Sequence, residues 1–198
     1  LSVRKATNIA TYGNVSAQLS DNSTGTLYVQ HSSGLVKLGS DTALSFGSGT
    51  SANERVRITS TGGVHFNNAE LIERANIVAN KLSAAPTINL DNGMIHHFTT
   101  TETTTATPNI TSTAGINTNM AVGDAMSITI VTTAAAAGYA ATVTIDHLNA
   151  GNNGGSLNWT GGSAPSDGGA SGVDIYAYTL IKTADAKFTV IATQTKTS

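Results

Sequence analysis

The end of the chain restricts the fold more than any other stretch, because residues 172–195 alternate as two long β-strands. Residues 173–181 carry apolar side chains on both sides of a period-2 pattern, which is typical of a strand in the interior of a sheet. Residues 187–195 alternate apolar with polar side chains, as in a strand with one face in water. The polar residues 182–187 predict a hairpin loop between them. A terminal hairpin of this kind needs a larger sheet to join.

The first third of the chain contains short strand patterns separated by clusters of Ser, Gly and Asp. These patterns lie at residues 26–30, 35–38, 43–46, 55–59 and 64–66. Each offers about two apolar side chains to a core, for example Leu44 with Phe46. A segment of about 65 residues with so few core residues is marginal alone, because small domains bury too little of their surface. We therefore expect residues 1–69 to form a shaft or attachment segment that neighbouring copies of the chain complete.

The rest of the chain, residues 70–198, predicts a second domain, an antiparallel β-sandwich of jelly-roll type. Before the terminal hairpin, its strand patterns lie at residues 87–90, 94–98, 126–131, 139–146 and 157–159. The turn Asp91-Asn-Gly93 predicts that residues 87–98 form a hairpin. Residues 70–82 fit either a helix or a strand, and the strand is favoured because Asn76-Ile-Val-Ala-Asn is a weak helix former. The predicted fold class is all-β.

Composition narrows the classes of function. The chain is poor in charged residues (11%), has a net charge of -2 and contains no cysteine. Its Lys and Arg residues are scattered, whereas nucleic-acid binding requires clustered cations. No apolar run approaches the roughly 20 residues that span a membrane, and the sequence has no cofactor motif. The chain opens at Leu1 without a signal-like segment, which predicts a processed product or part of a longer polypeptide.

Two parts of the chain resemble structural proteins of tailed phages. Glu54-Arg-Val-Arg-Ile-Thr-Ser-Thr-Gly-Gly-Val64 resembles a repeat found in the shafts of many fibre proteins. Residues 99–110, 158–165 and 173–196 are similar to the C-terminal domain of virion structural proteins from marine cyanobacterial and related phages. The resemblance implies a trimeric, β-rich protein on the virion surface, with other virion proteins as partners. It brings no catalytic residues to this chain.

Two groups of residues are candidates for binding. His96 and His97 are the candidates for a trimer axis, where three imidazoles would suit a transition metal. Because adjacent strand residues point to opposite faces, the two cannot jointly hold one ion, and ordinary strand histidines are the favoured interpretation. Trp159, Tyr176 and Tyr178 are the candidates for surface recognition, as a platform on which sugar rings stack. Core packing is the more common role of a lone tryptophan.

Two further groupings have the residue types of a site without its spacing. Asp146-His147 with Ser127 contains the members of a hydrolytic triad, but no Gly-x-Ser-x-Gly turn fixes a nucleophile. Asp91-Asn-Gly and Asn152-Asn-Gly-Gly contain calcium-ligand types, but turn formation explains them better. We therefore expect no catalytic residue, no metal and no cofactor.

The predicted function is a homo-oligomeric, fibre-like virion subunit that assembles with its own copies and attaches to a glycan or protein of the host surface. Two alternatives are a capsid decoration protein and an extracellular surface filament that polymerises by donating a strand from residues 1–25. A polysaccharide depolymerase is a more distant alternative, because it needs paired carboxylates. Its available glutamates are Glu54, Glu70, Glu73 and Glu102.

Overall fold

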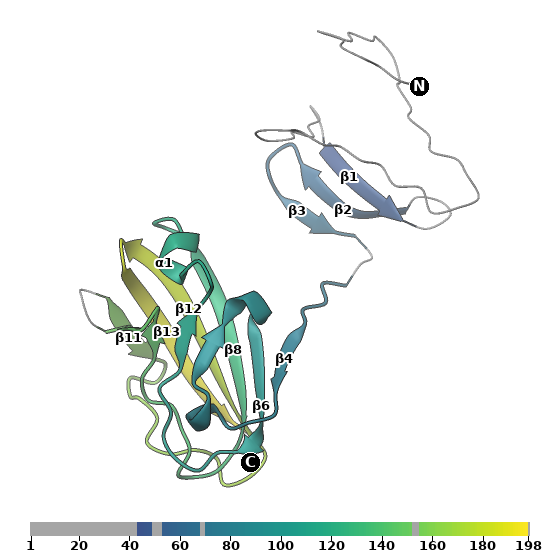
Figure 1. The fold of residues 1–198 in the computed structure, drawn as a ribbon. Helices are drawn as coiled ribbons and strands as arrows, with labels where there is room; N and C mark the ends of the chain where they lie inside the picture. Colours follow the sequence, from purple (N-terminus) through teal and green to yellow (C-terminus); the bar gives the residue numbers. More distant parts are fainter. Residues whose placement is uncertain (1–42, 49–52, 68–69, 152–154, 198) are drawn as a thin grey trace, which may run out of the picture. The chain divides into compact units, whose positions relative to one another are not determined.

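A computed structural model describes residues 43–48, 53–67, 70–151 and 155–197 (Figure 1). The chain divides into two compact units, Leu1–Glu70 and Leu71–Ser198. The sequence predicts this boundary one residue earlier, between residues 69 and 70. The fold is all-β, as predicted, and the helical elements in the described ranges are single short turns. The strand patterns at residues 26–30 and 35–38 and the donor segment 1–25 lie outside the described residues.

The described part of the first unit is an antiparallel meander of three strands. These are β1 (Ala43–Ser48), β2 (Asn53–Thr59) and β3 (Val64–Phe66), in that order across the sheet. The turn between β2 and β3 is closed by the amide of Thr59, which donates to the carbonyl of Gly63 at 2.8 Å. Gly62 in this turn has φ of +87°, a conformation that favours glycine. The strands predicted at residues 43–46, 55–59 and 64–66 are confirmed.

The second unit is built on a mixed six-stranded sheet with the order β11-β13-β12-β8-β6-β4. Its strands are β4 (Ala75–Val78), β6 (Ile95–Thr101), β8 (Ala125–Thr133), β11 (Ser156–Trp159), β12 (Val173–Ala184) and β13 (Lys187–Lys196). As predicted, β12 lies inside the sheet, with antiparallel neighbours on both sides. The hairpin turn is tighter than predicted, because β12 continues to Ala184 and only Asp185 and Ala186 connect it to β13.

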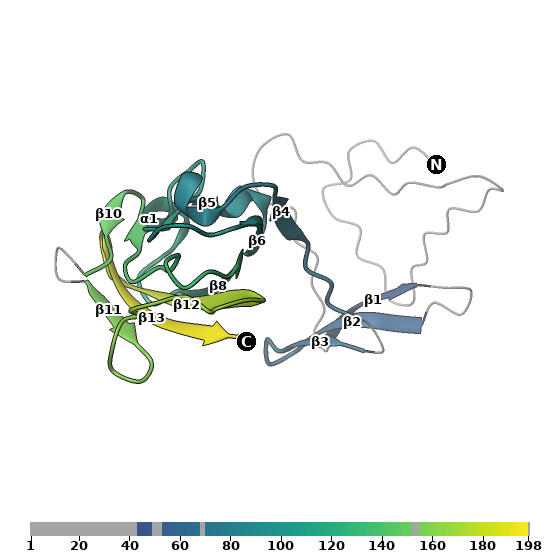
Figure 2. The same cartoon turned by 90° about the horizontal axis from the view of Figure 1, so that it is seen from below.

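A four-stranded sheet with the order β10-β9-β7-β5 covers one face of the six-stranded sheet (Figure 2). Its strands are β5 (Thr87–Asn89), β7 (Asn109–Thr111), β9 (Thr144–Ile145) and β10 (Leu148–Asn149). The short helical turns are η1 (Leu82–Ala84), η2 (Leu90–Asn92) and α1 (Ile116–Asn119). Ile88, Ile110 and Ile145 of this sheet pack in one core with side chains of β8, β12 and β13. Each large apolar side chain buried there contributes about 1.5–3 kcal/mol.

The strand pairing differs from the predicted antiparallel, jelly-roll arrangement. Five pairs of neighbours are parallel: β4 with β6, β6 with β8, β11 with β13, β5 with β7, and β7 with β9. Jelly rolls are antiparallel throughout. The predicted hairpin at residues 87–98 is also wrong, because β5 and β6 belong to different sheets. Between them Asn89 accepts a hydrogen bond from the amide of Asp91, and η2 turns the chain away.

Residues 139–146 form less strand than their alternation predicts, because only Thr144 and Ile145 are in a strand. The strand stops because Asp146 and His147 both have positive φ, 47° and 67°, which an extended strand does not allow. Within residues 70–82 the favoured strand is confirmed as β4, which pairs with β6.

Buried polar side chains tie the loops of the second unit to its strands. The ammonium of Lys182 on β12 donates to the carbonyls of Asn117 (2.5 Å) and Met120 (2.9 Å), which fixes α1. The carboxylate of Asp174, at the other end of β12, accepts from the amide of Gly169 at 2.9 Å. Glu102 accepts from the amides of η1. Each of these groups is hydrogen-bonded, as the cost of burying a polar group requires.

Candidate functional site

The candidate site is an exposed apolar face on the small sheet of the first unit. Strand register places its side chains in two rows that cross all three strands. One row is Leu44, Ile58 and Val64, and the other is Phe46, Val56 and Phe66. None of the six is buried: Phe46 and Phe66 are each 49% exposed and Val64 is 56% exposed. We call these six residues the apolar face.

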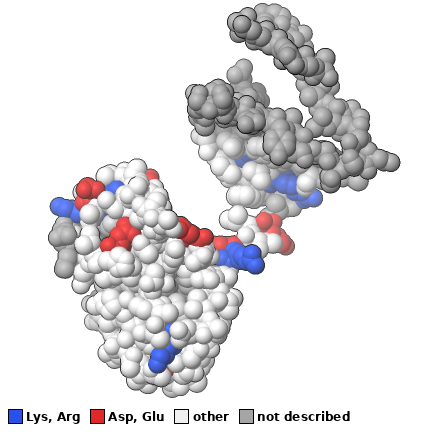
Figure 3. Space-filling view, viewed as in Figure 1, with Lys and Arg blue, Asp and Glu red and all other residues white. Residues whose placement is uncertain are grey.

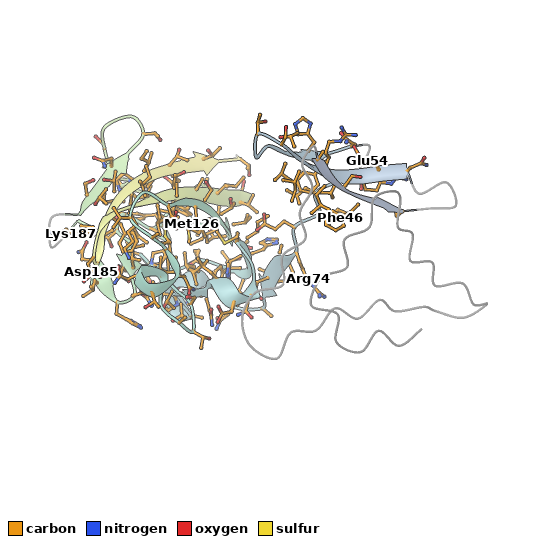
Figure 4. The ribbon with its side chains drawn as sticks, turned by 90° about the horizontal axis from the view of Figure 1, so that it is seen from above. Phe46, Glu54, Arg74, Met126, Asp185 and Lys187 are labelled. Carbon is orange, nitrogen blue, oxygen red and sulfur yellow. The ribbon has the colours of Figure 1, made fainter. Side chains whose placement is uncertain are left out.

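The opposite side of the same sheet is polar. Glu54 and Arg57 form an ion pair with a closest distance of 2.7 Å, and the side-chain amide of Asn67 donates to the carboxylate of Glu54. Hydrogen bonding from Arg57 lowers the pKa of the Glu54 carboxyl below its usual value. Figure 4 shows Phe46 and Glu54 on opposite sides of the ribbon. A β-bulge after Phe46 accounts for this placement, because it shifts the alternation of β2 so that Glu54 shares a side with Arg57.

A sheet with one polar and one apolar face needs something to cover the apolar face. Contiguous exposed apolar surface of this kind marks interaction sites in soluble proteins. In the second unit, the equivalent apolar faces of the two sheets cover each other. Among the described residues of the first unit, no second layer takes that role for β1, β2 and β3.

No protein-family model, curated protein or solved structure matches the chain. Among the described residues, no three His, Cys, Asp or Glu side chains gather as a metal site would require. No helix in those residues has the length and apolar content needed to cross a bilayer.

The histidine candidates lie on opposite faces of β6, as the alternation predicted. His96 is 1% exposed and sits in the core of its own chain. Its Nε2 donates to the carbonyl of Gly93 and its Nδ1 accepts from the side-chain amide of Asn76, both at 3.1 Å. Both ring nitrogens are therefore occupied, and the prediction of His96 as a trimer-axis residue is wrong. His97 is half-buried on the outer face of the sheet, and its proposed axial role stays a prediction.

Burial lowers the pKa of His96 below the usual value of 6.5. The unfolded chain therefore takes up a proton near pH 6.5 while folded His96 stays neutral, so the free energy of unfolding falls as the pH drops from about 6.5 towards the lowered pKa. We expect His96→Gln to unfold about 1–2 kcal/mol more easily at pH 8 but to lose less stability than the unaltered chain between pH 7 and pH 5. Urea titrations at the three pH values measure both effects. Equal pH slopes would contradict this assignment.

The aromatic candidates do not form a surface platform. Tyr176 and Tyr178 are 1% and 0% exposed, so their predicted role in surface recognition is wrong. Trp159 is partly buried and packs edge-on against Tyr178, with ring centroids 6.2 Å apart. The two rings meet because Trp159 and Tyr178 both lie beside Ala192 of β13, on the core side of the sheet. Trp159 therefore packs against the core, which is the more common role of a lone tryptophan.

The weaker catalytic groupings are not assembled in the described residues. The hydroxyl of Ser127 lies 3.4 Å from that of Thr179 on the outer face of the large sheet. Asp146 instead accepts hydrogen bonds from Thr111 and from the amide of Asn117. These contacts hold the turn after β9 and place no base beside a nucleophile.

The candidate glutamates of a depolymerase are likewise in separate settings. Glu54 is paired with Arg57, and Glu73 accepts from the amide of Met94. Glu102 is buried and bound to the amides of Leu82 and Ser83. The carboxylate of Asp91 accepts from the backbone amide and the hydroxyl of Thr113.

Proposed function

We propose that this chain is a structural subunit of a virion, fibre-like in its first unit, that assembles with copies of itself and has no enzymatic role. The observation that carries the proposal is the apolar face. None of its six side chains is buried, four of them are exposed, and the same face on other copies would cover them. Closed symmetric assemblies bury such self-complementary faces around a common axis.

The free energy gained by covering the apolar face is comparable to the free energy that association costs. Complete burial of a large apolar side chain contributes about 1.5–3 kcal/mol, so covering six half-exposed ones contributes on the order of 5 kcal/mol for each copy. Several copies together can offset the roughly 4–15 kcal/mol that association costs in lost freedom of motion. The polar face, with the Glu54–Arg57 ion pair, would then form the wet exterior of the assembly.

The proposed location is the surface of a virion, outside the cell, with other virion proteins and a host glycan or protein as partners. The resemblance of residues 54–64 to fibre-shaft repeats supports this location, and the meander formed by those residues suits a shaft. A capsid decoration protein or a surface filament subunit would use the same apolar face. The three differ in symmetry: a fibre closes around an axis, a decoration protein meets a shell, and a filament is an open chain.

Sedimentation equilibrium tests the proposal. We expect the whole chain to have a discrete mass that is a small multiple of 20.1 kDa. The double variant Phe46→Ser/Phe66→Ser removes about 2 kcal/mol of burial per copy and should weaken association about 30-fold per contact. The matched control is His65→Ser on the polar face of the same sheet, which should keep the original mass.

Each outcome separates the possibilities. A closed assembly that the two phenylalanine changes dissociate supports the fibre-like subunit. A polymer that lengthens with concentration supports the filament alternative. A monomer at all concentrations, or an assembly that is indifferent to Phe46 and Phe66, contradicts the proposal.

A further inference from the structure

The outer face of the six-stranded sheet in the second unit has an unusual composition. Strand register defines its side chains row by row. The first row is Ile77, His97, Val131, Ile175 and Thr195, and the second is Ala75, Ile95, Thr129, Ala177 and Thr193. The third is Ser127, Thr179, Ile191 and Asn158, and the fourth is Ala125, Ile181, Thr189 and Ser156. We call this surface the outer face.

The outer face contains no Asp, Glu, Lys or Arg in any of its four rows. The whole chain is 11% charged, and depletion of charge is the compositional mark of interface centres. The charged side chains of β12, Asp174 and Lys182, both point into the core. Charged residues of both signs do occur elsewhere on the second unit, scattered over the side visible in Figure 3.

Within the described residues of the second unit, no other element covers the outer face. The four-stranded sheet and α1 lie on the core side of the large sheet, as Figure 2 shows. Most residues of the outer face are half-buried by their neighbours alone, while Ile77 and Ile191 are 62% and 43% exposed. The surface therefore offers β-branched side chains and hydroxyls without any charge to desolvate.

The size of the outer face fits a protein interface. Its four rows hold 18 side-chain positions, five in each of the first two rows and four in each of the other two. Each position takes up about 4.8 Å across the sheet and about 6.8 Å along a strand, so the flat area is on the order of 600 Å². Two such faces together bury on the order of 1,200 Å², the lower end of the range for specific interfaces.

We propose that the outer face packs against the same face of another copy of this chain, so that the second unit takes part in the assembly. The inference rests on the proposed function, which supplies the sister copies. A charge-free face suits its own copy because no like charges meet when the face is paired with itself. A glycan fits less well, because the four rows contain no Trp, Tyr or Phe on which a sugar ring could stack.

Charge placed at the centre of the outer face tests this inference in the whole chain. We expect Thr179→Lys/Thr193→Lys to weaken association at least tenfold in sedimentation equilibrium at low salt. The matched control adds the same charge at exposed positions off this face, Thr104→Lys/Thr105→Lys, and should leave the association constant unchanged. Far-ultraviolet circular dichroism establishes that both variants stay folded.

Mixing variants distinguishes like-with-like packing from other effects of charge. If the outer face meets its own copy, Thr179→Lys/Thr193→Lys mixed with Thr179→Glu/Thr193→Glu should associate more tightly than either alone, and salt should weaken the mixture. Equal association by the lysine pair, the control and the unaltered chain overturns the inference, as does a mixture that behaves like its components.

The two proposals fail separately. If Phe46→Ser/Phe66→Ser dissociates the assembly while the lysine pair has no effect, the proposed function stands and the inference is overturned. If the lysine pair dissociates the assembly and the phenylalanine changes do not, the inference stands and the apolar face loses its role. A chain that is monomeric at every concentration overturns both.

Discussion

Replacing Tyr178 by alanine is expected to destabilise the second unit by about 3–5 kcal/mol, the cost of removing a large aromatic side chain from a packed core. Tyr178 lies on the central strand β12, is 0% exposed and contacts the ring of Trp159. The cavity would open between the two sheets, where Ile88, Ile110 and Ile145 meet β12 and β8. Urea unfolding followed by far-ultraviolet circular dichroism, at one fixed protein concentration, measures the loss.

Tyr178→Phe is the matched control, and it should behave in the opposite way. The hydroxyl of Tyr178 is buried without a hydrogen-bond partner in the described residues. A buried polar group left unpaired costs about 1–3 kcal/mol, so removing the oxygen alone should keep or raise stability, by about 1 kcal/mol. A large loss of stability in Tyr178→Phe would contradict this account of the core, as would a near-neutral Tyr178→Ala.

Gly168→Ala is expected to cost roughly 3 kcal/mol, the upper part of the usual range for overpacking. A methyl group built on Gly168 would lie 2.2 Å from the carbonyl oxygen of Ala135 and 2.7 Å from that of Gly138. Both obstacles are backbone, so they cannot rotate away. The same loop is held by the amide of Gly168, which donates to Ala136 at 2.9 Å. The single tryptophan, Trp159, reports the unfolding by its fluorescence.

Gly151→Ala is the control for this substitution. An added methyl group there meets only the side-chain oxygen of Asn149, at 3.8 Å, which is ordinary contact. Its stability should stay within about 0.5 kcal/mol of the unaltered chain. Equal effects at positions 168 and 151 would contradict the close packing of the loop around residues 161–172.

The long strands of the second unit were predictable because each carries its own signal. β8, β12 and β13 alternate over many residues, and β12 and β13 form an antiparallel hairpin that is local in sequence. The parallel partners of β4, β6 and β11 were not predictable. A parallel pair is not joined by a tight turn, so no turn sequence beside either strand marks its partner. A turn sequence such as Asp91-Asn-Gly93 therefore suggested a hairpin where the chain in fact passes between sheets.

The aromatic residues were misassigned because β12 is ambiguous by sequence. Tyr176 and Tyr178 share a face with Asp174 and Lys182, whereas the opposite face carries Ile175 and other uncharged residues. Both faces of β12 carry apolar side chains, so the alternation alone does not determine which face packs in the core. The structure resolves this because Asp174 and Lys182 are satisfied by loop backbone groups inside the protein. The charge-free alternation of the outer face was visible in the sequence, but only the strand register joins it across six strands.

Thiol reactivity measures whether other copies of the chain cover the apolar face, because the chain contains no cysteine of its own. Ile58→Cys places one thiol at the middle of the apolar face, and His65→Cys places one on the polar face of the same sheet. We predict that the thiol at position 58 reacts at least tenfold more slowly in concentrated than in dilute protein, while the thiol at position 65 reacts at the same rate in both. A thiol at position 58 that reacts as freely in concentrated protein as in dilute protein would contradict the account.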